Sequence, residues 1–266
     1  MDKILNTKLF IFDMDGTIYL GQKLIDGVVD LLDVLDNKYI NYIFLTNNSS
    51  KNSEDYKTKL ANLGIKAELK KIVNAGEVTA GHIKKIKSED ENRVYVVGTQ
   101  SLKDVFENYG FEVVNSRKNV DFLVLGFDTS LTYQKLWDAH YLINSGVKYF
   151  ATNPDQVCPL EKGRSMPDCG AITSLLKTST GQIPKVIGKP NVEMINYISE
   201  KFDADKRSIT MVGDRLYTDI KMAEDSNINS ILVLSGETKR SDLKSSTIKP
   251  DFVLKDIAEL KYLLKG

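Results

Sequence analysis

The chain lacks the long apolar segments that a membrane-spanning helix requires. None of its hydrophobic runs approaches the roughly 20 residues that cross a bilayer. Residues 1–6 also lack the extended apolar core of a secretory signal, so we expect no export signal there. The sequence is therefore predicted to belong to a protein that works in water and has no membrane partner.

Cysteine and net charge are both scarce. Only two cysteines, Cys158 and Cys169, occur in 266 residues, and their spacing matches no metal site. The 36 Lys and Arg residues balance 36 Asp and Glu residues, so no overall field attracts nucleic acid or an anionic membrane. These absences favour a reduced, cytoplasmic protein that binds any anionic ligand at a local site.

What the chain does have is a regular alternation of strand-like and helix-like segments. Apolar residues make up 42% of it, enough for one large domain or two modest ones. We expect strands at 9–12, 42–45, 93–97, 121–127, 148–151, 209–212, 230–234 and 251–254. Amphipathic helices are expected at 27–35, 53–63, 132–144, 191–202 and 219–225. This pattern predicts an α/β fold with a doubly wound, Rossmann-like parallel sheet.

The most informative segment follows the first predicted strand. Asp13 and Asp15 lie two positions apart, directly before Gly16 and Thr17. Side chains two apart on a strand point the same way, and crowded carboxylates are costly without a compensating cation or substrate. Mg²⁺ takes oxygen ligands and would leave Asp13 able to attack a phosphoryl group. The alternative is a strand that ends in an ordinary Asp-Gly turn.

Two further segments place polar side chains after apolar runs, where open parallel sheets bind their ligands. Thr46, Asn47 and Asn48 offer a hydroxyl and two amides that can bind phosphate oxygens without adding charge, or can cap a helix instead. Lys189 lies between a glycine and a proline, in a stiff turn. Its ammonium group can neutralise carboxylate and phosphate, although a solvated turn lysine is the simpler interpretation.

A third segment, at residues 211–219, adds two more carboxylates. Asp214 follows a predicted strand and a glycine, and it can complete a cation site with Asp13 and Asp15. Asp219 lies near the start of the next helix, where it can cap the helix or orient Asp214 or a metal-bound water. A supporting role is favoured for Asp219 over direct ligation.

Taken in order, these segments resemble the four signature motifs of the haloacid dehalogenase-like (HAD) phosphohydrolases. The matching positions are Asp13 to Thr17, Thr46, Lys189, and Gly213-Asp214 with Asp219. The long gap between Thr46 and Lys189 corresponds to the α/β cap domain that class IIA members insert. The stretches 124–133, 151–159 and 170–172 also resemble that class, in particular its p-nitrophenylphosphatase-like and sugar-phosphate phosphatases.

The resemblance implies a core domain at 1–76 and 183–266, interrupted by an inserted cap domain at 77–182. In the family the cap closes over the core and contributes a specificity loop. The candidates for substrate contact are Asn153, Asp155 and the stretch 164–170, although Asn153 and Asp155 are also typical turn residues. Caps of this class often form dimers, so a homodimer through the cap is one assembly that the resemblance allows.

Asp168 is a departure from the Pro-Gly-rich loop that many class IIA members have at this position. A carboxylate there can accept hydrogen bonds from a polyol, a sugar phosphate or an amine-bearing substrate. It can equally cap the helix that follows, and the sequence does not separate these two interpretations.

The resemblance implies a Mg²⁺-dependent phosphatase that hydrolyses small phosphate monoesters, such as a sugar phosphate, through an aspartyl-phosphate intermediate. Asp13 would be the nucleophile and Asp15 the general acid and base. The implied Mg²⁺ ligands are the carboxylates of Asp13 and Asp214 and the backbone carbonyl of Asp15. The implied phosphate-binding residues are Thr46, Asn47, Asn48 and Lys189, with Gly16, Thr17 and Asp219 in supporting roles.

Three other functions fit parts of this pattern. A receiver-type phosphoacceptor module uses similar residues, but it is about half this length and has no inserted cap. A phosphate-binding scaffold without catalysis is disfavoured because all four motifs are intact. A phosphotransferase or mutase of the same superfamily stays open, because the motifs do not distinguish transfer to water from transfer to an alcohol.

Overall fold

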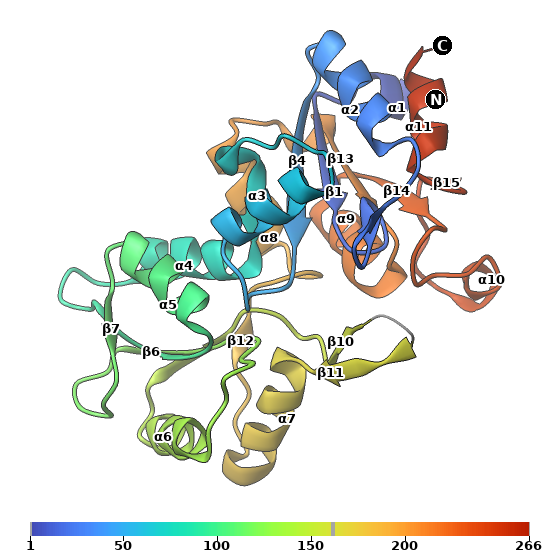
Figure 1. Ribbon diagram of the computed structural model, residues 1–266. Coiled ribbons are helices and arrows are strands. Elements are labelled where there is room, and N and C mark those ends of the chain that lie inside the picture. The colour runs from blue at the N-terminus through green and yellow to red at the C-terminus, as the bar shows by residue number, and fades with distance from the viewer. Residues whose placement is uncertain (1, 161–162, 266) are drawn as a thin grey trace. The chain divides into compact units, whose positions relative to one another are not determined.

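The computed structural model describes residues 2–160 and 163–265 of the chain (Figure 1). The described residues form two compact units, each with its own sheet. The first unit comprises 2–46, 56–73 and 189–265, and the second comprises 47–55 and 74–188. No helix within the described ranges is both long and apolar enough to cross a membrane.

The first unit is built on a six-stranded sheet in the order β15-β14-β13-β1-β4-β5. Its strands are β1 (Leu9–Asp13), β4 (Asn41–Thr46), β5 (Ile72–Asn74), β13 (Ile209–Gly213), β14 (Asn229–Val233) and β15 (Phe252–Leu254). The pairs β1/β4, β1/β13, β13/β14 and β14/β15 are all parallel. Because the chain winds outward in opposite directions from β1 and β13, a topological switch point lies between these two strands.

Helices and turns complete the first unit. The helices are α1 (Asp2–Leu5), α2 (Val28–Asn37), α3 (Ser53–Asn62), α8 (Glu193–Lys201), α9 (Lys221–Ser226), α10 (Asp242–Ser245) and α11 (Ile257–Lys265). Shorter turns are η1 (Leu69–Lys71), η3 (Lys206–Ser208) and the π-helical η4 (Leu216–Ile220). An antiparallel hairpin, β2 (Tyr19–Leu20) and β3 (Lys23–Leu24), follows β1.

The central strand β1 is buried along its whole length, which explains why it reads as an unbroken apolar run. The rings of Phe10 and Phe12 stack on one face of the sheet, with centroids 5.9 Å apart. They belong to one core cluster with Leu35 of α2 and Leu260 of α11, two helices that lie side by side in Figure 1. This burial holds the carboxyl end of β1 in a fixed position.

The second unit contains a five-stranded sheet in the order β12-β9-β8-β6-β7, with every pair parallel. Its strands are β6 (Arg93–Val97), β7 (Glu112–Val114), β8 (Phe122–Leu125), β9 (Lys148–Ala151) and β12 (Lys185–Val186). A separate hairpin joins β10 (Val157–Pro159) and β11 (Ser165–Pro167). The helices are α4 (Ala75–Ile86), α5 (Gln100–Asn108), α6 (Tyr133–Asn144) and α7 (Cys169–Thr180).

The predicted α/β fold with a doubly wound parallel sheet is confirmed, but the two units differ from the expected domain boundaries. Residues 183–188 were expected in the core domain, yet β12 pairs with β9 and extends the second sheet. Backbone hydrogen bonds from Ile187 to Ala151 and from Gly188 to Thr152 continue this pairing. Residues 47–55 and 74–76 also belong to the second unit. That the second unit acts as a cap stays a prediction.

Candidate active site

Two carboxylates meet at the switch point of the first sheet. Asp13 is the last residue of β1, and Asp214 follows the last residue of β13. The register pairs Phe12 with Val212, so both strands end at the same edge. Open parallel sheets bind their ligands at this edge.

Asp219 joins these two residues in a compact acidic cluster. One oxygen from each of Asp13, Asp214 and Asp219 lies within 4.8 Å of the others. Asp219 belongs to η4, and a Cβ at Gly213 would lie only 2.4 Å from its side chain, so glycine is needed there. The Asp219 Oδ2 atom accepts the backbone N–H of Arg215 at 3.2 Å, which fixes the carboxylate.

Lys189 supplies the positive charge inside this cluster. Its Nζ atom donates hydrogen bonds to Asp13 Oδ1 and, at 2.7 Å, to Asp219 Oδ1. Burial works against the charged form of Lys189, but the Asp13 and Asp219 carboxylates outweigh it and raise the pKa of the lysine. The two carboxylates therefore favour the charged form of Lys189, while its contact with phosphate stays a prediction.

The cluster still carries an excess of negative charge, because one ammonium faces three carboxylates. Burial raises the pKa of Asp13 well above its ordinary value, with Asp219 and Asp214 adding to the effect and Lys189 opposing it. Burial and the neighbouring Asp219 raise the pKa of Asp214 to about 7. Such a site is stable only when protons or a cation compensate the charge.

The surroundings of Asp214 fit a hard divalent cation. Its Oδ2 atom accepts the backbone N–H of Glu237 at 2.6 Å, whereas Oδ1 is buried and accepts no hydrogen bond from any residue in the described ranges. A Cβ at Gly16 would lie 2.4 Å from Oδ2, and a Cβ at Gly236 would lie 1.9 Å from it. Only glycine therefore lets the backbone pass so close to the carboxylate at these two positions. An unpartnered buried oxygen beside two further carboxylates is the donor set that Mg²⁺ prefers.

Asp15 lies outside this acidic cluster. Its side chain is 56% exposed, and Oδ2 accepts a hydrogen bond from the hydroxyl of Tyr19 at 3.3 Å. Lys59 of α3 places its Nζ atom 4.0 Å from Asp15 Oδ1. The structure therefore gives Asp13 and Asp15 different surroundings, one buried against a lysine and the other on an exposed turn.

The turn after Asp15 depends on Gly16, whose φ of 91° few other residues adopt. Gly16 donates its N–H to the carbonyl of Tyr19 at 2.8 Å. Thr17 is fully buried, and its Oγ1 atom has no hydrogen-bond partner in the part of the chain that the structure describes. Both residues belong to the turn and not to the acidic cluster, and their supporting roles stay a prediction.

The residues predicted to bind phosphate separate into two groups. Thr46 ends β4, one position beyond Leu45, the register partner of Asp13. Asn47 and Asn48 belong to the second unit, and Asn48 Oδ1 accepts the N–H of Ser50 at 2.9 Å in a local turn. The structure thus places Thr46 next to the register partner of Asp13 in the first sheet, while phosphate contact by Thr46, Asn47 and Asn48 stays a prediction.

Within the second unit the structure brings three of the predicted residues together. Asn47 Nδ2 donates to Asp155 Oδ2 at 3.0 Å, and Asn153 Nδ2 donates to the Asn47 carbonyl at 2.9 Å. Asn153 Oδ1 also accepts the N–H of Asp155 at 3.0 Å. This contact forms the turn that was predicted as the alternative to substrate contact. Asn153 and Asp155 therefore have at least a structural role.

Asp168 has the capping contact that the sequence allowed. It is buried at the start of α7, and its Oδ1 atom accepts the backbone N–H of Cys169 at 2.5 Å. The N–H of Asp168 itself donates to the Gln156 carbonyl at 3.0 Å. Substrate contact by this residue stays a prediction.

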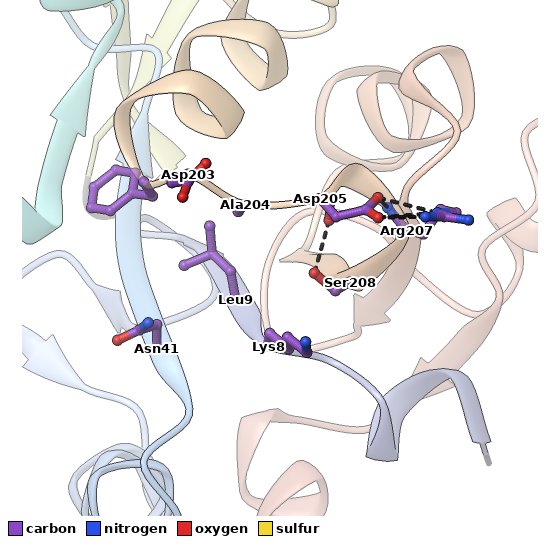
Figure 2. A pocket seen from close by; sticks show the side chains of 9 residues that line it. Lys8, Leu9, Asn41, Asp203, Ala204, Asp205, Arg207 and Ser208 are labelled. Atoms are coloured by element: carbon purple, nitrogen blue, oxygen red, sulfur yellow. Dashed lines mark hydrogen bonds and ion pairs between the residues drawn. The ribbon is translucent and has the colours of Figure 1, made fainter.

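A pocket in the first unit lies away from the acidic cluster. Its lining includes Leu9, the first residue of β1, and Asn41, the first residue of β4 (Figure 2). Asp13 ends the same strand about 13 Å further along, at roughly 3.3 Å per residue. Asp205 and Arg207, which also line the pocket, form the ion pair marked in Figure 2, and their closest atoms lie 2.7 Å apart. The pocket is therefore at the edge of the sheet opposite the acidic cluster.

A carboxylate at the end of a central strand, a buried lysine and an acidic cluster on a doubly wound sheet are the features expected of a class of phosphoryl-transferring enzymes. The haloacid dehalogenase-like hydrolase profile matches residues 10–112, and a related HAD-hydrolase-like profile matches residues 186–260. The acid sugar phosphatase of Staphylococcus haemolyticus is 35% identical over 252 residues, covering 95% of this chain and 94% of that protein.

Solved structures agree with these matches. The 4-nitrophenylphosphatase of Thermotoga maritima has a TM-score of 0.93 and 44% identity, covering 98% of this chain and 99% of that one. A glycerol phosphate phosphatase of Mycobacterium tuberculosis, solved with magnesium, has a TM-score of 0.89 and 26% identity, covering 97% of this chain and 78% of that one. The chain belongs to the haloacid dehalogenase-like hydrolases and is a phosphatase of that family, which confirms the prediction made from its motifs.

Sequence reasoning missed several residues of the site. Tyr19 and Lys59, which contact Asp15, belonged to no motif, and neither did Gly236 and Glu237, which enclose Asp214. The only local signal was a tyrosine hydroxyl four positions after Asp15, in an otherwise apolar run. Lys59 had no signal at all, because only the packing of α3 brings it to the turn.

Proposed function

We propose that the chain hydrolyses small phosphate monoesters, sugar phosphates among them, through a phosphate ester of Asp13. The observation that carries this proposal is the Asp13 carboxylate at the end of β1, hydrogen-bonded by the buried ammonium of Lys189. That ammonium offsets the repulsion between a carboxylate nucleophile and an anionic phosphoryl group. The names of the relatives, an acid sugar phosphatase and a 4-nitrophenylphosphatase, support this substrate class.

In the first step an oxygen of Asp13 attacks phosphorus and the bond from phosphorus to the ester oxygen breaks. The electron pair of that bond stays on the leaving oxygen, which takes a proton from the carboxyl group of Asp15. The products of this step are a free alcohol, an aspartyl-phosphate and the Asp15 carboxylate. Lys189 and the hydroxyl of Thr46 hold phosphoryl oxygens throughout.

In the second step the Asp15 carboxylate takes a proton from water, whose oxygen attacks phosphorus. The bond from phosphorus to Asp13 breaks, and its electron pair returns to the Asp13 carboxylate. Inorganic phosphate leaves, and Asp15 is protonated again for the next cycle. One residue therefore acts first as the acid and then as the base.

The residues that would hold Mg²⁺ are the carboxylates of Asp13 and Asp214 and, by analogy with the family, the backbone carbonyl of Asp15. When bound, the cation would offset the negative charge of the phosphoryl group and of the three crowded carboxylates. Asp219 keeps Lys189 and the Arg215 backbone in place beside this cluster.

We expect the stabilisation by Mg²⁺ to grow as the pH rises from about 4 to above 7. The pKa of Asp214 is raised from its ordinary 3.8 to about 7. In the metal-free protein, the proton on Asp214 therefore stabilises the fold fully below the pKa of the unfolded state, and this stabilisation is lost as the pH rises through the pKa of the folded state. Mg²⁺ compensates the carboxylate at high pH and must displace its proton at low pH. Melting temperatures at pH 5, 6, 7 and 8, with and without Mg²⁺, measure this difference.

The matched variant for this experiment is Asp214→Asn, which removes the charge at constant size. It should raise the melting temperature of the metal-free protein at pH 8 and reduce the shift that Mg²⁺ produces. A Mg²⁺ shift that is the same at every pH, or unchanged in the variant, would show that Asp214 does not bind the cation.

The substrate class is tested by phosphate release with Mg²⁺ from sugar phosphates, glycerol phosphate, p-nitrophenyl phosphate, pyridoxal phosphate, phosphoglycolate and nucleotides. We expect release from the sugar phosphates, with one phosphate formed for each alcohol. A shortfall of phosphate in the presence of an added sugar would instead indicate transfer to that sugar. Failure to release phosphate from any of these esters would contradict the proposed function.

A further inference from the structure

Three side chains of the first unit meet on the turn after β1. Tyr19, the first residue of β2, donates its phenolic proton to Asp15 Oδ2 at 3.3 Å. Lys59, on α3, places Nζ 3.6 Å from the centre of the Tyr19 ring and 4.0 Å from Asp15 Oδ1. The tyrosine is thus in contact with a carboxylate through its hydroxyl and with an ammonium through the face of its ring.

The three groups differ sharply in burial. Tyr19 has no exposed surface, the Lys59 side chain is 19% exposed, and the Asp15 side chain is 56% exposed. A buried phenolic hydroxyl needs a hydrogen-bond partner, and Asp15 provides it. Conversely, an exposed aspartate on a turn can rotate between several side-chain conformations unless a neighbour holds it.

The backbone fixes Tyr19 relative to the turn that carries Asp15. The N–H of Tyr19 donates to the carbonyl of Met14 at 3.2 Å, and the carbonyl of Tyr19 accepts the N–H of Gly16 at 2.8 Å. Asp15 and Tyr19 also form an isolated β-bridge. These backbone contacts fix the position of Tyr19, so its hydroxyl approaches the Asp15 carboxyl group from a defined direction.

Tyr19 can act only as a neutral hydroxyl. Burial and, next, the neighbouring Asp15 raise its pKa far above the ordinary value, so the phenol keeps its proton throughout the physiological range. Lys59 contacts both partners, since its Nζ lies over the ring at 3.6 Å and forms an ion pair with Asp15 Oδ1 at 4.0 Å, a distance too long for a hydrogen bond. Tyr19 thus holds the carboxyl group by a hydrogen bond, while Lys59 holds the ring and faces the other carboxylate oxygen.

We infer that Tyr19 and Lys59 are positioning residues that hold the Asp15 carboxyl group so that Oδ1 exchanges the proton with the reacting oxygen. This inference rests on the proposed function, in which Asp15 protonates the ester oxygen as its bond to phosphorus breaks. With Oδ2 engaged by the phenol, the remaining oxygen carries the mobile proton. Loss of the hydroxyl leaves the acid present but less often in the productive orientation.

The test is Tyr19→Phe, which removes the hydroxyl and keeps the buried ring and its contact with Lys59. For glycerol phosphate, whose alkoxide needs a proton to leave, we expect kcat/KM to fall on the order of tenfold through lost orientation. For p-nitrophenyl phosphate, whose phenolate leaves without a proton, the change should stay below about twofold because general acid assistance is not used. Where hydrolysis of the aspartyl-phosphate limits turnover, kcat and KM should fall together and leave kcat/KM unchanged, because Asp15 is also the base of that step.

Lys59 and an exposed tyrosine provide matched variants. Lys59→Met removes the charge at similar length and should lower kcat/KM for glycerol phosphate selectively, whereas Lys59→Arg keeps a cation over the ring and should restore it. Tyr39→Phe makes the same chemical change as Tyr19→Phe at an exposed position, and it should leave kcat/KM for both esters unchanged. If Tyr19→Phe does not fold, the two Lys59 variants carry the test.

The possible outcomes separate this inference from the proposed function. An equal loss of kcat/KM on both esters would indicate a merely structural role, and no loss of kcat/KM on either would indicate no role, so each would overturn the inference. If Asp15→Asn lowers hydrolysis of neither ester, or the unaltered protein hydrolyses neither, the proposed function itself fails.

Discussion

Replacement of Asp13 by asparagine should abolish phosphate release from every ester that the protein hydrolyses. An amide of the same size keeps the position at the end of β1 but cannot form the aspartyl-phosphate. The other buried carboxylates of the cluster are held by Lys189, Arg215 and Glu237 and do not replace it. Loss of a nucleophile of this kind lowers turnover on the order of 10⁴-fold or more.

The direct measurement for Asp13→Asn is the acid-stable transfer of a labelled phosphoryl group to the protein. The unaltered protein should carry label during turnover, and the variant none. Asp33→Asn, on the exposed side of α2, is the matched control and should label normally. Metal-dependent turnover by Asp13→Asn at a rate near normal would rule out the covalent mechanism.

The same substitution should stabilise the metal-free protein while it removes activity. Asp13, Asp214 and Asp219 lie within reach of one cation, and burial together with mutual repulsion raises the pKa of Asp13 and of Asp214. Asparagine removes one of the three repelling charges, and Lys189 keeps the Asp219 carboxylate as its partner. A variant that is inactive but melts at a higher temperature would show that the cluster is retained for chemistry and not for folding.

The parts of the fold that could be predicted from the sequence are those with a local signal. β1 reads as a strand because both faces of the central strand are buried, and the apolar run is therefore unbroken. Asp13, Asp214 and Lys189 could be predicted because each follows such a run, and the carboxyl ends of parallel strands meet at one edge. The alternation of strands and helices was enough for the class of fold.

The parts that could not be predicted depend on contacts between distant segments. β12 has only two residues, so no periodicity reveals that it joins the second sheet. Lys59 lies on an amphipathic helix, and nothing in its own surroundings indicates that it reaches the ring of Tyr19. Asp168 had two equally good interpretations because a carboxylate before a helix is a common cap, and only the structure shows the bond to Cys169.

Replacement of Asp15 by asparagine should separate the two chemical steps. The side chain is exposed, so the variant should fold normally, with a melting temperature close to that of the unaltered protein. Steady-state turnover of either ester should fall on the order of 10²–10⁴-fold, the usual contribution of a general acid or base. The rate-limiting step, however, should differ between the two esters.

With p-nitrophenyl phosphate, Asp15→Asn should release one phenolate per active site rapidly and then turn over slowly. The phenolate leaves Asp13-bound phosphorus without needing a proton, whereas the water that must hydrolyse the aspartyl-phosphate has lost its base. With glycerol phosphate no burst should appear, because the first step already needs the acid. Stopped-flow absorbance and labelled phosphoryl transfer measure these two cases, with Asp33→Asn as the control. A uniform slowing without a burst would assign Asp15 to cation binding alone, because proton transfer would then have no separate effect on the two steps.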